Sequence, residues 1–252
     1  MDAQQQETLS KVPEVTLIFW IIKIFATTLG ETGGDTLSMS MHLGYLVSTG
    51  IFAIVFAIAV MVQIRAKKFH PVIYWTTIIA TTTVGTTIAD FVDRSLGIGY
   101  AGGTTILVIL LISSLTLWYL KLGSVAVDTV SSPKSEVFYW VTIMFSQTLG
   151  TALGDWAADT AGLGYGGGVV LFTALLAVIA AAYYLTTIST TVLFWSAFVL
   201  TRPLGAVVGD FLDKPISHGG LALSRYSASA TLIAMIIIFI FVFPHRPARR
   251  SH

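Results

Sequence analysis

Acidic residues recur at one fixed distance from an aromatic–tryptophan pair in this 252-residue chain. Counted from each tryptophan, a glycine stands at position plus ten and an aspartate at position plus fifteen. The tryptophans are Trp20, Trp75, Trp140 and Trp195, the glycines Gly30, Gly85, Gly150 and Gly205, and the aspartates Asp35, Asp90, Asp155 and Asp210. Carboxylates in four equivalent positions are candidates for binding protons or metal cations.

Helical spacing places further polar residues on the same face as each aspartate. Positions plus seven, plus eleven and plus fifteen are four residues apart, so they lie along one side of a helix. The four stripes read Thr27-Glu31-Asp35, Thr82-Thr86-Asp90, Gln147-Thr151-Asp155 and Arg202-Ala206-Asp210. Polar faces turn away from lipid, so we expect the stripes to meet on a central axis.

The chemistry of these side chains favours a cation site. Five carboxylates and the guanidinium of Arg202 would leave four negative charges in a low-dielectric cavity, and such a cluster binds protons, binds cations or exchanges one for the other. Oxygen ligands suit Mg²⁺, Ca²⁺, Mn²⁺ or a trivalent ion, and cysteine is absent. We expect a polyvalent metal cation as the transported substrate, with Mn²⁺ as the preferred candidate, and no resident cofactor. The predicted ligands are Glu31, Asp35, Asp90, Asp155 and Asp210, supported by Thr27, Thr82, Thr86, Gln147, Thr151 and Arg202.

Two sets of residues allow more than one interpretation. Arg202 either forms a salt bridge that keeps the resting site neutral, or acts as a tethered cation that occupies the site when metal has left. Asp93, Asp159 and Asp213 are either solvated helix-end residues or an outer vestibule that collects cations. Basic neighbours, Arg94 and Lys214, follow two of these acids and favour the solvated interpretation.

Long apolar segments must position these residues. Hydrophobic residues make up 55% of the chain and charged residues only 11%, whereas about 25% of residues in a soluble domain are charged. In each repeat, a first segment with the acidic motif leads through a glycine-rich tip to a second, more apolar segment of spanning length. The first segments are 15–38, 72–92, 137–158 and 192–212, and the second are 47–64, 103–122, 168–188 and 226–243. This predicts an all-α integral membrane protein of eight transmembrane helices arranged as four helical hairpins. The predicted repeat boundaries are 1–70, 71–133, 134–190 and 191–252.

A second level of repetition indicates two parallel halves. The second and fourth repeats share Asp-Phe-x-Asp-basic, and the first and third share Thr-Leu-Gly-x-x-x-Gly-Asp, as expected for a duplicated pair of hairpins. The aromatic–tryptophan pairs are predicted to lie at a lipid–water interface, with core packing as the alternative. The midplane glycines are expected to let helices approach closely, and Lys23 to snorkel toward the interface.

Positive charges predict the orientation. Most of them lie near the termini or in the links between repeats, including Arg249 and Arg250. By the positive-inside rule both termini are expected to be cytoplasmic, with the glycine-rich tips outside.

The repeated hairpin with its tryptophan, glycine and aspartate resembles bacterial membrane-anchored proteins built from four copies of a repeat of unknown function. That resemblance implies a multi-pass inner-membrane protein and carries no settled activity. The stretch Glu31-Thr32-Gly33-Gly34-Asp35-Thr36 is similar to the Glu-x-Gly-Asp-basic-Ser/Thr signature of calcium/manganese–proton exchangers. It has one residue more than the signature, and Thr36 stands at the basic position.

Three functions fit the sequence. The first is a transporter that exports a polyvalent metal cation in exchange for protons, with the lipid bilayer as its other partner. The second is a cation channel with a ring of acidic residues as its filter, and the positive charge of Arg202 in the pore argues against it. The third is a non-transporting membrane anchor or regulator, which the lack of a soluble domain opposes. We do not expect an enzyme, and a net charge of +1 does not indicate nucleic acid as a partner.

Overall fold

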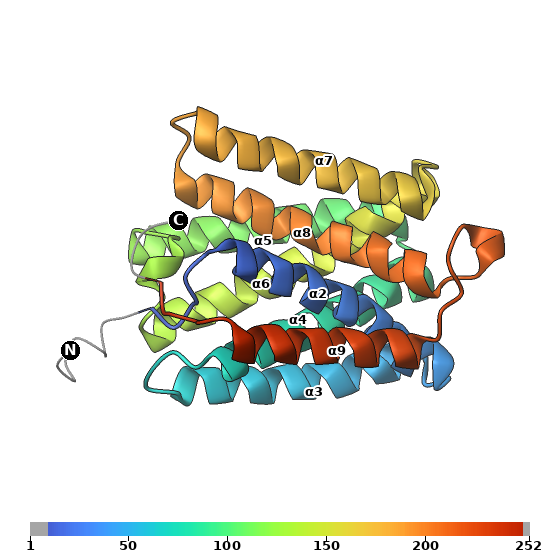
Figure 1. The fold of residues 1–252 in the computed structure, drawn as a ribbon, viewed down its shortest axis with the longest axis horizontal. Coiled ribbons are helices and arrows are strands. Elements are labelled where there is room, and N and C mark those ends of the chain that lie inside the picture. Colours follow the sequence, from blue (N-terminus) through green and yellow to red (C-terminus); the bar gives the residue numbers. More distant parts are fainter. Residues whose placement is uncertain (1–9, 249–252) are drawn as a thin grey trace.

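A computed structural model describes residues 10–248, so Arg249 and Arg250 lie outside the described residues. Within this range the chain is helical, and the only β-type pairing is an isolated bridge between Pro13 and Pro247. The long helices, shown in Figure 1, are α2 (Leu17–Asp35), α3 (Gly44–Arg65), α4 (Pro71–Asp90), α5 (Gly99–Leu122), α6 (Pro133–Asp155), α7 (Gly164–Leu185), α8 (Thr190–Asp213) and α9 (Arg225–Val242). Short π-helical turns follow three of them, η1 (Thr36–Ser40), η2 (Phe91–Ser95) and η4 (Trp156–Thr160), and two 3-10 turns are η3 (Val127–Thr129) and η5 (Ile216–His218).

The motif-bearing helices form an inner ring. Helices α2, α4, α6 and α8 each pack against two others of this set, and α8 closes the ring onto α2. The second helix of each repeat lies outside the ring. Figure 1 shows α7 and α3 along opposite edges of the bundle. The predicted architecture of eight helices in four repeats is therefore present.

The packing partners add a feature that the sequence does not reveal. Each outer helix packs along the inner helix of the next repeat: α3 on α4, α5 on α6, α7 on α8, and α9 on α2. In the first three repeats, the two helices of one repeat meet mainly at the π turn between them. The four repeats thus interlock in a closed circle, because no repeat covers its own inner helix.

Burial agrees with a lipid environment. Six helices, α3, α4, α5, α7, α8 and α9, are long and apolar enough to cross a membrane. The outer ones are mostly exposed, with 6% of the spanning residues of α3 buried against 72% for α4. Apolar surface on the outside of a bundle suits hydrocarbon rather than water. The other two helices, α2 and α6, carry charged residues and are held inside this apolar ring, so we treat them as spanning too.

Three of the four tryptophans, Trp75, Trp140 and Trp195, lie inside the bundle, so their predicted place at the lipid interface is wrong, whereas Trp20 is partly exposed. Trp75 is 1% exposed and Trp140 2%. Each aromatic residue that precedes a tryptophan instead contacts the tryptophan of the next repeat, because the outer helices separate the inner ring from lipid. The ring centroids are 5.3 Å apart for Phe19 and Trp75, 5.7 Å for Tyr74 and Trp140, 6.2 Å for Tyr139 and Trp195, and 5.9 Å for Phe194 and Trp20. This aromatic ring packs the bundle at the end near the termini.

The recurrent glycines allow close approach of the inner helices. An added Cβ at Gly85 would lie 3.0 Å from the backbone nitrogen of Thr148, and one at Gly205 would lie 2.8 Å from the carbonyl carbon of Thr27. In every repeat the plus-ten glycine receives the plus-seven side chain of a neighbouring inner helix: Thr82 at Gly30, Gln147 at Gly85, Arg202 at Gly150 and Thr27 at Gly205. The glycines are therefore packing residues that set the spacing of the polar stripes.

Both described chain ends lie at one end of the bundle. The amide of Glu14 donates to the carbonyl of Arg246, and the amide of Ala248 donates to that of Val12. Lys23, expected to snorkel outward, is instead fully buried over the ring of Phe198, with 3.8 Å between Nζ and the ring centroid.

Candidate functional site

The four polar stripes meet at the guanidinium of Arg202. This side chain from α8 is fully buried. Its Nη2 donates to Glu31 Oε2 on α2 at 3.0 Å, and to the hydroxyls of Thr86 on α4 and Thr151 on α6 at 2.5 Å each. One nitrogen therefore contacts the other three inner helices, and the arginine lies across the axis of the ring.

The layer of plus-seven residues is also buried, and its polar groups are only partly bonded. Thr27 donates to the carbonyl of Lys23 at 3.0 Å. Thr82 Oγ1, both amide atoms of Gln147, and Nε and Nη1 of Arg202 have no hydrogen-bond partner among residues 10–248. This layer could hold water, since the groups come from three different helices and face one axis.

The aspartate row forms two cation-bridged pairs. Arg94 bridges Asp90 and Asp155, with Nε 3.1 Å from Asp90 Oδ1 and Nη2 3.2 Å from Asp155 Oδ2. Lys214 bridges Asp35 and Asp210 in the same manner, at 2.5 Å and 3.1 Å from its Nζ. All four aspartates are buried. The row is thus two pairs, rather than one ring of free carboxylates.

The two bridges are related by the internal duplication. In each half, the basic residue stands four positions after the aspartate of its own helix and reaches the aspartate of a neighbouring repeat. The shared Asp-Phe-x-Asp-basic motif supplies the bridge, and the first and third repeats supply the second acid. This arrangement explains why the duplicated unit is a pair of repeats.

One group of acids could hold a metal ion. Glu31, Asp35 and Asp210 each offer a carboxylate oxygen, and these oxygens lie within 4.8 Å of one another. All three residues are buried, and Asp35 Oδ1 has no hydrogen-bond partner. Asp90 and Asp155, also predicted as ligands, lie in the other bridged pair and do not join this group. Oxygen donors in this number suit a hard divalent ion.

The second acids differ from the expectation of solvated helix ends. Asp213 is buried and pairs with Arg225 Nε at 2.8 Å rather than with the adjacent Lys214. Asp93 is buried beside Gly103, and neither of its oxygens has a hydrogen-bond partner. Asp159 is exposed, as expected, and accepts a bond from Tyr100 Oη at 3.2 Å. The expected pairing of Asp93 and Asp213 with their basic neighbours is wrong, because those neighbours turn toward the aspartate row.

The electrostatic balance is therefore less negative than four charges. Six buried carboxylates (Glu31, Asp35, Asp90, Asp155, Asp210 and Asp213) form ion pairs with four basic groups (Arg94, Arg202, Lys214 and Arg225), which leaves two negative charges at full ionisation. Buried Asp93, whose oxygens have no hydrogen-bond partner in the described chain, adds a third. Sequence reasoning associated Arg94 and Lys214 with Asp93 and Asp213 and missed their pairing with the aspartate row. Their spacing of four residues from Asp90 and Asp210 was the available signal. Arg225, at the start of the last helix, gave none.

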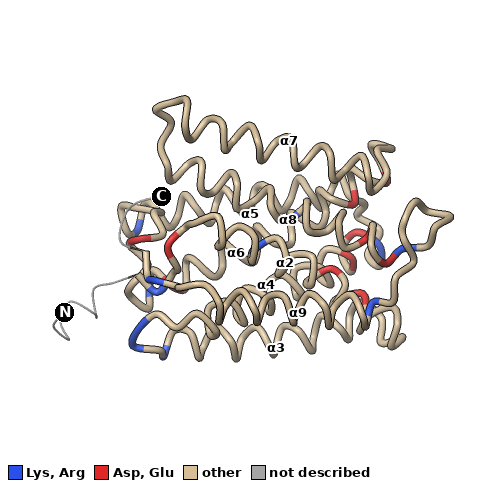
Figure 2. The backbone as a smooth tube through the Cα atoms, in the orientation of Figure 1, with Lys and Arg blue, Asp and Glu red and all other residues tan. Residues whose placement is uncertain are grey.

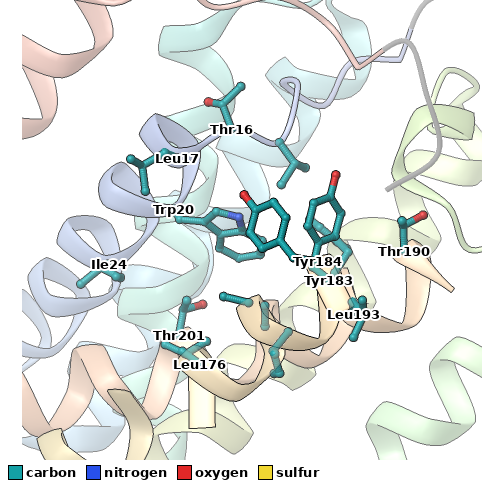
Figure 3. A pocket seen from close by; sticks show the side chains of 15 residues that line it. Thr16, Leu17, Trp20, Ile24, Leu176, Tyr183, Tyr184, Thr190, Leu193 and Thr201 are labelled. Carbon is teal, nitrogen blue, oxygen red and sulfur yellow. The ribbon is translucent and has the colours of Figure 1, made fainter. Parts of the chain in front are cut away.

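The charged site and an apolar cavity lie apart. Figure 2 shows most acidic positions gathered at the end of the bundle opposite the termini. A cavity of about 500 Å³ lies instead between α2, α7 and α8 in the half near the termini, lined mainly by apolar side chains such as Trp20, Ile24 and Leu176 (Figure 3). It contains no carboxylate, so it is not a site for a bare cation.

Comparison with known proteins gives one match. A family model described as Repeat of Unknown Function (DUF347) matches the chain four times, over residues 18–69, 73–123, 138–189 and 193–247. These ranges follow the four repeats predicted from the tryptophan spacing. Neither the curated proteins nor the solved structures gave a match. The similarity to calcium/manganese–proton exchangers finds no support in these comparisons.

Proposed function

Because this chain belongs to the family of the Repeat of Unknown Function (DUF347), whose description names no activity, we propose its function from the site. The chain is an all-helical membrane-type repeat protein with a buried carboxylate cluster. We propose that it is a secondary transporter that moves a polyvalent metal cation in exchange for protons, and Mn²⁺ is the preferred candidate for that cation. We further propose a bacterial inner membrane, cytoplasmic termini and outward metal movement.

The observation that carries this proposal is the group Glu31, Asp35 and Asp210, buried inside a bundle with an apolar outer surface. Carboxylates inside a membrane are expensive, about 2.5–3.5 kcal/mol each on insertion scales, and usually serve a purpose. Lys214 bridges Asp35 and Asp210, and Glu31 pairs with Arg202, so three carboxylates converge where one bridge needs only two. Asp35 Oδ1 has no hydrogen-bond partner in the described chain and is free to bind a further cation.

Exchange follows from competition for the same oxygens. A metal ion binds the ionised carboxylates and not the protonated ones, so metal and protons displace each other. Loading with metal at one face and with protons at the other moves the two in opposite directions. The parallel duplication supports this proposal, since some transporters consist of two such halves.

A channel is less consistent with the same features. Arg202 lies across the axis with bonds to three other helices, and the aromatic ring packs the end near the termini. A cation on that axis would meet a fixed positive charge and then an apolar layer. The second candidate is a non-transporting anchor or regulator, which is favoured by one observation: every aspartate of the row has a basic partner.

The test is flux through purified protein in liposomes. Mn²⁺, Mg²⁺, Ca²⁺, Zn²⁺ and Al³⁺ are added outside, with a metal indicator and a pH dye inside. We expect metal entry with a linked pH change in the wild type. Asp35→Asn or Asp210→Asn, each of which removes a carboxylate of the candidate metal group, should abolish both signals, whereas Asp93→Asn should only slow them.

Exposed Asp159 offers a matched control, because Asp159→Asn removes a carboxylate outside the aspartate row and should leave flux unchanged. Flux that persists in both Asp35→Asn and Asp210→Asn would remove the site assignment. Folded wild-type protein that moves none of the five ions would favour the anchor.

A further inference from the structure

Lys214 already holds the position of a cation between two of the three candidate ligands. Its ammonium donates to Asp35 Oδ2 at 2.5 Å and lies 3.1 Å from Asp210 Oδ1. An ammonium is a compact point charge, the nearest side-chain equivalent of a metal ion. The third ligand, Glu31, is bonded to Arg202 and not to Lys214.

The charge of the group matches a divalent ion once Lys214 is withdrawn. Glu31, Asp35 and Asp210 contribute three negative charges at full ionisation, and Arg202 removes one. Two negative charges then remain, which a divalent cation neutralises and a trivalent one exceeds. Arg225 and Asp213 form their own pair, with Arg225 only at 3.6 Å from Asp35.

The backbone at Lys214 differs from that at its counterpart Arg94. Arg94 lies within the π turn η2, so its main chain is part of a continuous helix. Helix α8 ends at Asp213, and Lys214 is extended, with φ −73° and ψ 156°. It begins a loop, residues 214–224, that has no equivalent in the first three repeats, where a π turn follows the motif helix. The main chain of Lys214 is held by hydrogen bonds from its amide to the Asp210 carbonyl and from the Ala222 amide to its own carbonyl. The ammonium can therefore be withdrawn by rotation of its flexible side chain, without unwinding a helix.

The side chain of Arg94 is also more firmly held. Its planar guanidinium contacts Asp90, Asp155 and the hydroxyl of Tyr45 at 3.3 Å. A guanidinium fixes several directional bonds at once, whereas an ammonium on a flexible stem exchanges partners readily. No third acid joins this bridge in the described chain. The two pseudo-symmetric bridges therefore differ in ligand number, base and backbone.

We propose that Lys214 is a tethered cation that competes with a divalent metal ion for the site formed by Glu31, Asp35 and Asp210, while Arg94 is a permanent structural bridge. The inference rests on the proposed transport function and adds its substrate class and its internal competitor. Metal binding displaces the ammonium by rotation of the Lys214 side chain, and departure of the metal allows Lys214 to return. A positive charge, either the ammonium or the metal ion, is therefore always present beside the carboxylates of the site.

Binding of Mn²⁺ to purified protein, measured by calorimetry, gives the first test. A competitor that occupies a site lowers the apparent affinity of the site for the metal, in proportion to the fraction of time that the site is free. Lys214→Met should therefore bind Mn²⁺ at least about tenfold more tightly than the wild type. Arg94→Met is the matched control, since it removes the equivalent bridge, and its affinity should not rise.

Labelling of wild-type lysines with an amine reagent, read by mass spectrometry, gives a second test that needs no variant to fold. Lys214 should label slowly without metal, and saturating Mn²⁺ should raise its rate several-fold while exposed Lys67 keeps its rate. Wild-type protein that binds Mn²⁺ with no change at Lys214, or a folded Lys214→Met protein with unimproved affinity, would overturn the competitor and leave the transport function standing. Absence of Mn²⁺ binding by both the wild type and a folded Lys214→Met protein would remove the proposed function as well.

Discussion

The pair of Arg202 and Glu31 provides the sharpest test of how the site is held together. Arg202 is fully buried and Glu31 is 3% exposed. Removing one partner of such a pair leaves an uncompensated charge and costs about 3–5 kcal/mol of stability. Arg202→Met keeps a long apolar stem against Gly150 but deletes the bonds to Glu31, Thr86 and Thr151. We expect this variant to lose about 3–5 kcal/mol of unfolding free energy.

The double variant separates charge from packing. Glu31→Gln alone should also be destabilised, since the guanidinium then lacks its carboxylate. The combination Glu31→Gln with Arg202→Met removes both charges, so its loss should be smaller than the sum by about 1–3 kcal/mol. The measurement is equilibrium unfolding in mixed micelles with increasing SDS, read by circular dichroism. The unfolding free energies of the variants are compared at one SDS fraction near their midpoints.

A residue outside the bridges provides the control. Exposed Lys67 forms no ion pair among the described residues, and its replacement by Met should change the unfolding free energy by less than about 0.5 kcal/mol. Losses that add within error in the double variant would show that Arg202 and Glu31 do not depend on each other. Arg202 would then not hold the inner helices together through its pair with Glu31.

Three further outcomes follow from the packing and the charges. Gly205→Ala should destabilise the protein, because its methyl group would lie 2.8 Å from the carbonyl carbon of Thr27, whereas Gly33→Ala, with nothing within 4 Å, should gain about 0.5–1 kcal/mol. Thermal unfolding in detergent compares the two, and equal shifts would contradict the close approach. Lys23→Met should raise the unfolding temperature. Among the described residues its ammonium contacts Thr201, the Phe198 carbonyl and the Phe198 ring but no carboxylate, so burying this charge costs folding free energy. A lowered temperature would assign Lys23 a structural role. Mn²⁺ affinity should fall as pH decreases, with protons released on binding, because the metal takes only ionised carboxylates. Calorimetry in two buffers of different ionisation enthalpy measures that release, and pH-independent binding would exclude these acids as ligands.

The helices and the repeat were predictable because they depend on local pattern. Spanning length, apolar composition and the tryptophan interval determined eight helices in four units. The partner of each outer helix was not predictable, because an apolar helix surface such as that of α3 fits α2 or α4 equally well by composition. The place of the tryptophans was misjudged for a related reason. A tryptophan at a helix end suits an interface, and only the outer ring of helices excludes lipid from Trp75 and Trp140.

The site was predictable as a set of side chains and not as a set of pairs. Helical spacing brought the stripes onto one axis, where Arg202 bonds to Glu31, as one of the two interpretations expected. The expectation of a strongly negative cluster failed since Arg94 and Lys214 were assigned to the acids beside them in sequence. In a helix, side chains four positions apart lie on the same face, whereas those of adjacent residues point in different directions. That rule predicts the contacts of Arg94 with Asp90 and of Lys214 with Asp210, but not those with Asp155 and Asp35.

The departures from symmetry lie together and indicate where function resides. At the plus-three, plus-eleven and plus-seven positions, Lys23, Glu31 and Arg202 replace residues that are uncharged in the other repeats. The loop that carries Lys214 is likewise confined to the last repeat. All four belong to the first or the last repeat, whose inner helices α2 and α8 meet where the circle closes. The cavity between α2, α7 and α8 opens on this same interface. A repeated scaffold needs none of these exceptions to pack, because three of its four units do without each of them. Their concentration at one interface therefore favours an activity at α2 and α8, with the opposite interface of α4 and α6 as its structural counterpart.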